Sequence, residues 1–152
     1  MTAVLQRVKS AALYVDNRLI SQIGYGLYIL LGVEKGDTER DAVALAEKIS
    51  KLRIFSDDND KMNLSLLDVK GAALVVSNFT LAANYSHGNR PDYLNAEPPS
   101  KAEELYSFFA RKLNEKIEIV KTGIFGADMT TEMTTIGPVT IVMKSSVLIG
   151  GK

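Results

Sequence analysis

The chain has 152 residues, 46% of them hydrophobic, which is the size of one domain with enough apolar side chains for a substantial core. Its 18 basic and 18 acidic residues cancel, which excludes a strong overall attraction to nucleic acid, so a nucleic-acid partner would have to meet a local patch. The absence of cysteine excludes disulfides, thiolate nucleophiles and sulfur-ligated zinc. Because no apolar run could span a bilayer and no signal peptide is evident, we expect a cytoplasmic protein with no membrane partner.

The first part of the chain has the alternation and the apolar runs of β-structure. Strands are predicted at residues 2–8, at about 11–15 and at about 18–33. The Asp16-Asn17 pair is a turn signal, so neighbouring strands should be antiparallel and joined by hairpins. The stretch "GLYILLGV" is apolar on both faces and predicts a buried strand.

Two amphipathic helices are predicted from apolar residues at helical spacing. The first follows Asp37 or Thr38, either of which can act as N-cap. The second begins at Ser100, which forms a capping box with Glu103. The expected buried stripes are Ala42, Leu45, Ala46, Ile49 and Leu52 in the first helix, and Ala102, Leu105, Tyr106, Phe109 and Leu113 in the second.

The remaining segments complete a single domain over residues 1–152. "AALVVSNFTLAA" predicts another buried strand, and the polar loop "NYSHGNRPDYLNAEPP" after it is long enough to be functional. Two more strands are predicted at 117–121 and 139–147. The pattern favours an α+β fold with a mostly antiparallel sheet covered by two helices.

The chain offers poor candidates for a metal or cofactor site. The acidic cluster "DDND" at 57–60 lacks the ligand spacing, the Gly and the final Glu of a calcium loop, so it is better explained as a solvated loop. His87 is the only histidine, and it has no second His or Cys to share a metal. The sequence therefore predicts no metal and no cofactor.

Ser77 and Thr80 are the most interesting hydroxyls because they end a buried strand, where a rigid scaffold can hold them at a cleft. The residues alone favour the simpler explanation that they satisfy backbone groups. A hydroxyl nucleophile needs a base, and His87 is poorly placed to be one. A hydrolytic site here would use backbone N–H groups to stabilise an oxyanion and would take its nucleophile or base from water or substrate.

Gly137-Pro138 precedes the strand predicted at 139–147. The residues alone favour a plain turn at the start of that strand. A Gly before Pro would also let the backbone approach a ligand without a Cβ in the way.

Several stretches follow one another in an order and spacing that resembles the D-aminoacyl-tRNA deacylases, also called D-tyrosyl-tRNA deacylases. The resemblance covers essentially the whole chain. It is carried by "AVLQRVKSA", "LLGVEKGDTERDAVALAEKISKLRIFSDDNDKMNLSLLDVKG", "LVVSNFTLAA", "GNRPDY", "TGIFGADM" and "GPVTI".

This resemblance implies a barrel-like β-β-α sandwich with two main helices outside, a homodimer, and aminoacyl-tRNA as substrate. The site of the family pairs a Ser-Gln-Phe-Thr segment of one subunit with a Gly-cis-Pro of the other. The corresponding residues here are Ser77, Asn78, Phe79 and Thr80, which would face Gly137 and Pro138 of the partner. The dipeptide would thus be a turn at the start of a strand that crosses the dimer interface.

The implied reaction is hydrolysis of the ester between a D-amino acid, or glycine, and the terminal ribose of tRNA. Main-chain N–H groups at about Asn78 and Phe79 would hold the oxyanion, Thr80 would orient the substrate, and the ribose 2′-hydroxyl would supply activation. The Gly-Pro carbonyls would fix the α-amino group so that an L side chain collides with the backbone. By the same resemblance, Arg7 would brace the partner's Gly-Pro loop and Met129 would line the pocket near it.

Two departures from the family pattern keep alternatives open. Asn78 replaces the family's Gln, and Thr135 replaces an Asn that usually lies two residues before the Gly-Pro. One alternative is a dimeric tRNA-binding paralogue without turnover or with a shifted substrate. Another is a hydrolase of small esters that uses Thr80 directly. Contacts with tRNA are expected to be few and local, at Arg53, Lys61 or Arg90.

Overall fold

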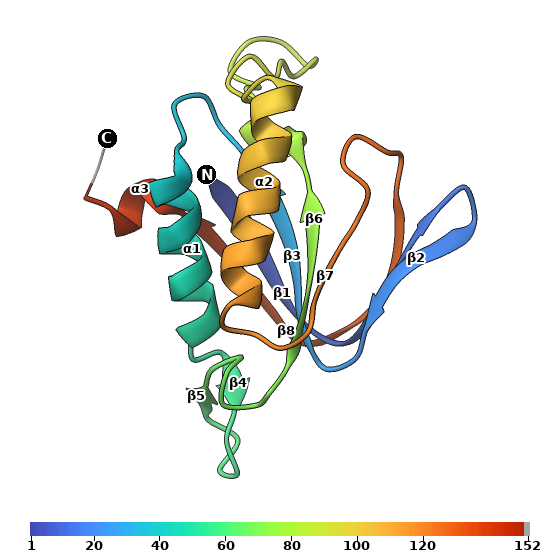
Figure 1. The fold of residues 1–152 in the computed structure, drawn as a ribbon, viewed down its shortest axis with the longest axis vertical. Coiled ribbons are helices and arrows are strands. Elements are labelled where there is room, and N and C mark those ends of the chain that lie inside the picture. Colours follow the sequence, from blue (N-terminus) through green and yellow to red (C-terminus); the bar gives the residue numbers. More distant parts are fainter. Residues whose placement is uncertain (151–152) are drawn as a thin grey trace.

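The computed structural model describes residues 1–150 as a curved sheet with helices packed on one face (Figure 1). The strands of the main sheet follow the order β2-β1-β3-β6-β7, and β8 pairs with the other edge of β1. They are β1 (Thr2–Val15), β2 (Arg18–Ile23), β3 (Gly26–Gly32), β6 (Ala72–Ser77), β7 (Val120–Thr122) and β8 (Thr130–Lys144). A small separate hairpin consists of β4 (Phe55–Ser56) and β5 (Met62–Leu64). The helices are α1 (Glu39–Lys51), α2 (Pro99–Asn114), α3 (Ser145–Leu148) and the 3-10 turn η1 (Phe79–Ala82).

The mixed α+β architecture and the antiparallel N-terminal strands are confirmed, with two refinements. The segments predicted at 2–8 and 11–15 form one long strand, β1, whose first half pairs with β3 and whose second half pairs with β2. This exchange of partners curls the sheet toward a barrel. The pairs β3-β6 and β6-β7 are parallel, because the chain returns through α1 and α2 between these strands.

Two clusters of buried side chains fill the fold. The larger one lies between the sheet and the helices, and it includes Leu5, Leu45 and Phe109. The smaller one lies within the curled half of the sheet around Leu13 and Leu74. All the predicted stripe residues of the two main helices are buried or packed against the larger cluster, so the helical periodicity correctly identified the inward faces.

The two helix starts differ in how well the sequence predicted them. Thr38 is the N-cap of α1, and its N–H and hydroxyl both donate to the Asp41 carboxylate at 2.9 Å. The capping box predicted at Ser100 is wrong: α2 begins at Pro99, and its N-cap residue makes no side-chain cap. The N-cap residue, Pro98, has no side-chain acceptor to form a cap, and Pro99 at the first helical position favours the helix start because its φ is already helical.

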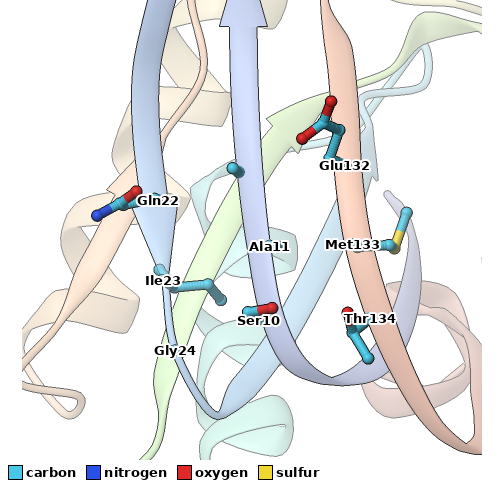
Figure 2. Close-up of a pocket in the computed structure, with 9 residues that line it drawn as sticks. Ser10, Ala11, Gln22, Ile23, Gly24, Glu132, Met133 and Thr134 are labelled. Atoms are coloured by element: carbon cyan, nitrogen blue, oxygen red, sulfur yellow. The ribbon is translucent and has the colours of Figure 1, made fainter.

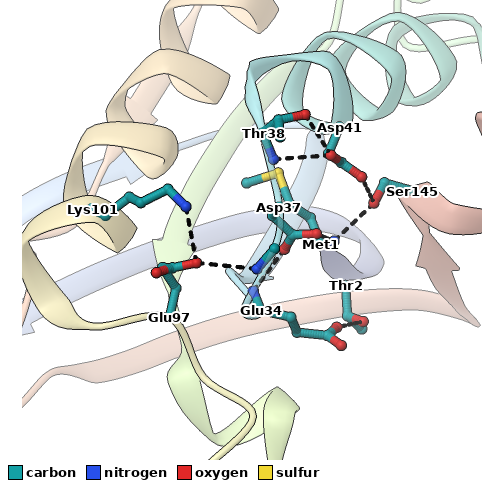
Figure 3. Close-up of polar contacts among 10 residues, drawn as sticks. Met1, Thr2, Glu34, Asp37, Thr38, Asp41, Glu97, Lys101 and Ser145 are labelled. Atoms are coloured by element: carbon teal, nitrogen blue, oxygen red, sulfur yellow. Dashed lines mark hydrogen bonds and ion pairs between the residues drawn. The ribbon is translucent and has the colours of Figure 1, made fainter. Parts of the chain in front are cut away.

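A buried polar network joins the start of β1 to α1 and α3 (Figure 3). The Met1 ammonium group donates to Asp37 at 2.6 Å and to the Ser145 hydroxyl at 2.8 Å. Ser145 in turn donates to Asp41 at 2.8 Å. These contacts fix α3 directly after β8, beside α1. None of the helices within residues 1–150 has the length and apolar character needed to cross a bilayer.

Candidate functional site

The residues of the "SNFT" segment lie where β6 ends and the chain turns into η1. The Asn78 N–H donates to the Leu31 carbonyl at 2.9 Å, which continues the parallel ladder one residue beyond the strand. The Asn78 side-chain oxygen accepts the Thr80 N–H at 3.1 Å and also the Thr80 hydroxyl. Of the two expected oxyanion donors, the Asn78 N–H is thus engaged in a backbone hydrogen bond, and its role toward an oxyanion stays a prediction. The Phe79 N–H donates to no atom within residues 1–150 and remains available.

Around this turn the surface carries an exposed aromatic pair. The Phe79 ring is 60% exposed and meets the Tyr93 ring edge-on, with centroids 5.0 Å apart. Tyr93 comes from the loop after η1, which is closed by paired backbone hydrogen bonds between Asn84 and Asp92 at 2.8 and 2.9 Å. Sequence reasoning placed this loop near a functional region but did not identify Tyr93, because an aromatic residue in a polar loop shows no partner in sequence.

Gly137-Pro138 lies within β8, which corrects the prediction of a turn before a strand. The peptide bond is cis, as expected. Two steps along β1, from Gln6 to Val8, correspond to five along β8, from Thr140 to Thr135, so the dipeptide lies in a bulge that leaves the ladder. The sequence misplaced the strand start because the first half of β8 is polar and exposed, and a polar edge lacks the apolar pattern of a buried strand.

Arg7 holds this bulge from the inside. The side chain is buried, its Nε donates to the Ile136 carbonyl at 3.3 Å, and its Nη1 donates to the Ile54 carbonyl at 2.9 Å. Within its own chain Arg7 therefore braces the Gly137-Pro138 loop, and the expected contact with the partner's loop stays a prediction. The antiparallel pairing of β1 with β8 brings Arg7 opposite the bulge.

Met129 belongs to the other half of the predicted site. Its sulfur lies 2.6 Å from where a Cβ on Gly123 would be, so a side chain at that position would have to displace the Met129 side chain. The Gly123 N–H donates to the Val75 carbonyl at 3.2 Å, two residues before Ser77 in β6. Met129 is thus connected to the "SNFT" strand of its own chain.

A buried tyrosine stabilises the same strand. The Tyr106 hydroxyl, on α2, donates to the Val75 carbonyl at 2.8 Å. Burial raises the pKa of Tyr106 to about 12, so the phenol stays neutral and remains a donor across the ordinary pH range.

The two halves of the predicted site lie apart within one chain. Ser77 pairs with Leu31, Leu31 pairs with Ala3, and β8 lies one strand further, so three strand spacings separate Ser77 from β8. At about 4.8 Å per spacing this is about 14 Å across the sheet, and the four residues from Ala3 to Arg7 add about 13 Å along it. The structure brings Arg7 to Gly137 and Met129 to the Ser77 strand, but it does not bring these two groups together in one subunit.

The remaining candidates are His87 and the acidic loop around Asp57. His87 is exposed in the loop after η1. Asp57 accepts hydrogen bonds from Asn59, Lys61 and Asn63, chiefly the Lys61 N–H, which lower the pKa of its carboxyl. The cluster is therefore a self-capped turn, as the solvated-loop explanation predicted. Within residues 1–150, no group of three acidic or histidine side chains is placed to hold a metal ion.

A hollow of about 610 Å³ lies outside the predicted site, between β1, β2 and β8. Figure 2 shows its lining, in which Gln22 and Glu132 carry the largest polar groups. None of the predicted catalytic residues lines it, and its only ionisable side chain is Glu132. We therefore assign the candidate site to the "SNFT" turn and the Gly137-Pro138 bulge, and not to this hollow.

Comparison with known proteins agrees with the geometry. The family described as D-Tyr-tRNA(Tyr) deacylase matches residues 4–144. A D-aminoacyl-tRNA deacylase of Persephonella marina is 51% identical over 97% of this chain and 100% of its own length, and one of Bacillus cytotoxicus is 47% identical over 95% and 99%.

Solved structures show the same fold. The c-Myc DNA Unwinding Element Binding Protein superposes with a TM-score of 0.90 at 38% identity, covering 95% of this chain and 98% of its own. A probable eukaryotic D-amino acid tRNA deacylase superposes with a TM-score of 0.80 at 16% identity, covering 94% and 99%, and supports the fold alone. On the family match and the near-complete coverage of these relatives, the chain belongs to the D-Tyr-tRNA(Tyr) deacylase family.

Proposed function

We propose that this protein hydrolyses the ester between a D-amino acid, or glycine, and the terminal ribose of tRNA, and that it does so as a homodimer. The observation that supports this most directly is the separation of the "SNFT" turn from the Gly137-Pro138 bulge within one chain, while both remain exposed. A two-fold dimer in which each bulge enters the partner's turn would assemble two complete sites. The names of the relatives supply the substrate class.

In the proposed reaction a water molecule attacks the ester carbonyl, and the ribose 2′-hydroxyl oxygen of the substrate accepts the water proton while its own proton is released toward the leaving ribose oxygen. The developing oxyanion accepts the free Phe79 N–H, while the Thr80 hydroxyl orients the substrate. Collapse of the tetrahedral intermediate breaks the bond to the ribose oxygen, which takes up the proton. The products are the free amino acid and deacylated tRNA. This scheme needs no protein base, which suits a site whose nearest histidine is an exposed loop residue.

Chiral selection is proposed to come from the Gly137-Pro138 bulge of the partner. Its carbonyls would fix the α-amino group, so that a D side chain projects away from the backbone and an L side chain collides with it. The buried Arg7 guanidinium supports this role, since it anchors the bulge to the interior of the subunit. A selection that works by exclusion should tolerate many side chains and admit glycine.

The experiment that tests the proposal is a time course of ester hydrolysis on matched D-Tyr-tRNA and L-Tyr-tRNA, with sedimentation of the same sample. We expect rapid loss of the D ester, persistence of the L ester, and a dimer. A monomer that is fully active would refute the cross-subunit site. A folded dimer that spares both esters would instead favour the substrate-shifted or non-catalytic paralogue suggested by Asn78 and Thr135.

A further inference from the structure

A cationic hollow at the C-terminal end of α1 has no role in the chemistry described above. It occupies about 660 Å³ near the C-terminal end of α1, with Leu148 of α3 on its other wall. Lys48, Lys51 and Arg53 line it, and all three are exposed. Its remaining lining residues are Ala44, Glu47 and Leu52.

The charge of this hollow is net positive and largely uncommitted. Glu47 is its only acidic residue, and its carboxylate lies 3.6 Å from the Lys116 amino group. The amino groups of Lys48 and Lys51 make no hydrogen bond or ion pair within residues 1–150. In a chain of zero net charge, two free lysines one helical turn apart are a local site for an anion.

Arg53 is more strongly tied to the protein. Its Nε donates to the Asn63 carbonyl at 2.6 Å, and its charge acts on the nearby Asp57 and Asp68 carboxyls. The two lysines are therefore the primary contacts of the hollow, and Arg53 forms its edge.

The fold connects this hollow to the bulge. The single Arg7 guanidinium bonds both Ile54, which follows Arg53, and Ile136, which precedes Gly137. The opposite wall, α3, continues directly from β8, the strand that contains the bulge. In the proposed dimer the bulge enters the partner's site, so Ile54, the neighbour of Arg53 in the hollow, is joined through the Arg7 side chain to the segment that enters that site.

We propose that Lys48 and Lys51 bind backbone phosphates of the tRNA near its 3′ end, on the subunit that contributes the Gly-Pro bulge. This inference rests on the proposed function and names the surface that the substrate occupies beyond its terminal nucleoside. An ester of a D-amino acid with adenosine has the reacting atoms and the 2′-hydroxyl but no phosphate. Loss of the lysine contacts should therefore slow hydrolysis of the tRNA ester but not of the adenosine ester, whereas damage to the catalytic site should slow both.

The test compares Lys48→Gln/Lys51→Gln with the wild type on D-Tyr-tRNA and on the D-tyrosyl ester of adenosine. We expect kcat/KM on the tRNA to fall about tenfold. We also expect the slope of log(kcat/KM) against the logarithm of the salt concentration to become shallower by about 1.4, because each phosphate contact with a single strand contributes about 0.7. Hydrolysis of the adenosine ester should not change. Arg18→Gln/Lys121→Gln removes the same charge from two exposed residues on β2 and β7 and should have little effect on either substrate.

Each outcome decides one of the two proposals. Equal loss on both substrates, or no loss on the tRNA, overturns the phosphate contact while leaving the deacylase intact. The lysines also stabilise the C-terminal turn of α1, so thermal unfolding of the variant is measured as well. If the wild type cleaves neither ester, the catalytic proposal fails, and binding of deacylated tRNA is then compared between the wild type and the same variants. Binding that weakens in Lys48→Gln/Lys51→Gln supports the phosphate contact of the two lysines, and binding that does not change overturns that proposal as well.

Discussion

Asn78 and Thr80 are tied together through one oxygen atom: the Asn78 side-chain carbonyl accepts both the N–H and the hydroxyl of Thr80. Asp at position 78 can accept the same two bonds, but it adds a negative charge beside the place where the oxyanion would form. We expect Asn78→Asp to fold normally and to lower kcat about 100-fold, as is typical for damage to an oxyanion site. Asn17→Asp, in the distant turn between β1 and β2, is the matched control. Unchanged kcat in the first variant would remove Asn78 from the site.

Thr80→Val separates the two proposed origins of catalysis. The substitution removes the hydroxyl but keeps the backbone N–H, so a substrate-orienting Thr80 predicts a loss in kcat/KM of about tenfold on D-Tyr-tRNA. A nucleophilic Thr80 predicts complete loss instead. Thr80→Ser should restore most of the activity in either case. A terminal 2′-deoxyribose should stop turnover by the wild type if activation comes from the substrate; rapid hydrolysis of that substrate would contradict the proposed mechanism.

Gly137→Ala tests the shape of the bulge. Gly137 has a φ of +122°, and a Cβ there would lie 2.8 Å from the Val139 N and 3.3 Å from Arg7. We expect destabilisation of about 1–3 kcal/mol and a loss of about 100-fold in kcat/KM for D-Tyr-tRNA, because small displacements at a site are costly. Gly88 also has a positive φ, of +70°, but has open space around it, so Gly88→Ala should leave hydrolysis unchanged. Equal activity in both variants would show that the bulge does not contact the substrate.

Tyr106→Phe should change how stability depends on pH. The unfolded phenol ionises near pH 10 and the native one near 12, so the stabilising effect of Tyr106 is complete below about pH 10 and is lost as the pH rises toward 12. At pH 7 the variant should be less stable by about 1 kcal/mol, the value of one hydrogen bond. Urea unfolding from pH 7 to pH 11.5 should show the two proteins converging. Tyr85→Phe, at an exposed position, should follow the wild type throughout.

Ser145→Ala tests the buried network that fixes α3. The hydroxyl accepts from the Met1 ammonium group and donates to Asp41, both at 2.8 Å, and its loss leaves two buried charged groups short of a partner. We expect a loss of about 1–3 kcal/mol in the free energy of unfolding. Ser146→Ala removes the same atoms from a less buried neighbour and should cost far less. Equal effects in the two variants would mean that the network contributes little to stability.

The sequence best predicted those helices and strands whose local pattern of apolar residues coincides with the face that is buried. The apolar stripes of α1 and α2 and the buried strand ending at Ser77 follow from side-chain periodicity, which each segment carries by itself. The antiparallel N-terminal strands follow from the Asp16-Asn17 turn signal between them. The family motifs then named the site residues. Neither periodicity nor the motifs show how segments far apart in the sequence pair, and the parallel pairs β3-β6 and β6-β7 were not predicted for that reason.

Tertiary structure alone decided how the site residues are grouped. The sequence placed Gly137-Pro138 before a strand, whereas pairing with β1 extends β8 back to Thr130 and turns the dipeptide into a bulge. The same pairing brings Arg7 to the bulge of its own chain. The pairing of β6 with β3 likewise determines that the Asn78 N–H donates to the Leu31 carbonyl, which the sequence motif does not show. Composition and periodicity determine which faces are buried because burial depends on each side chain. Register and hydrogen-bond partners depend on residues far apart in the chain, so only the folded protein determines them.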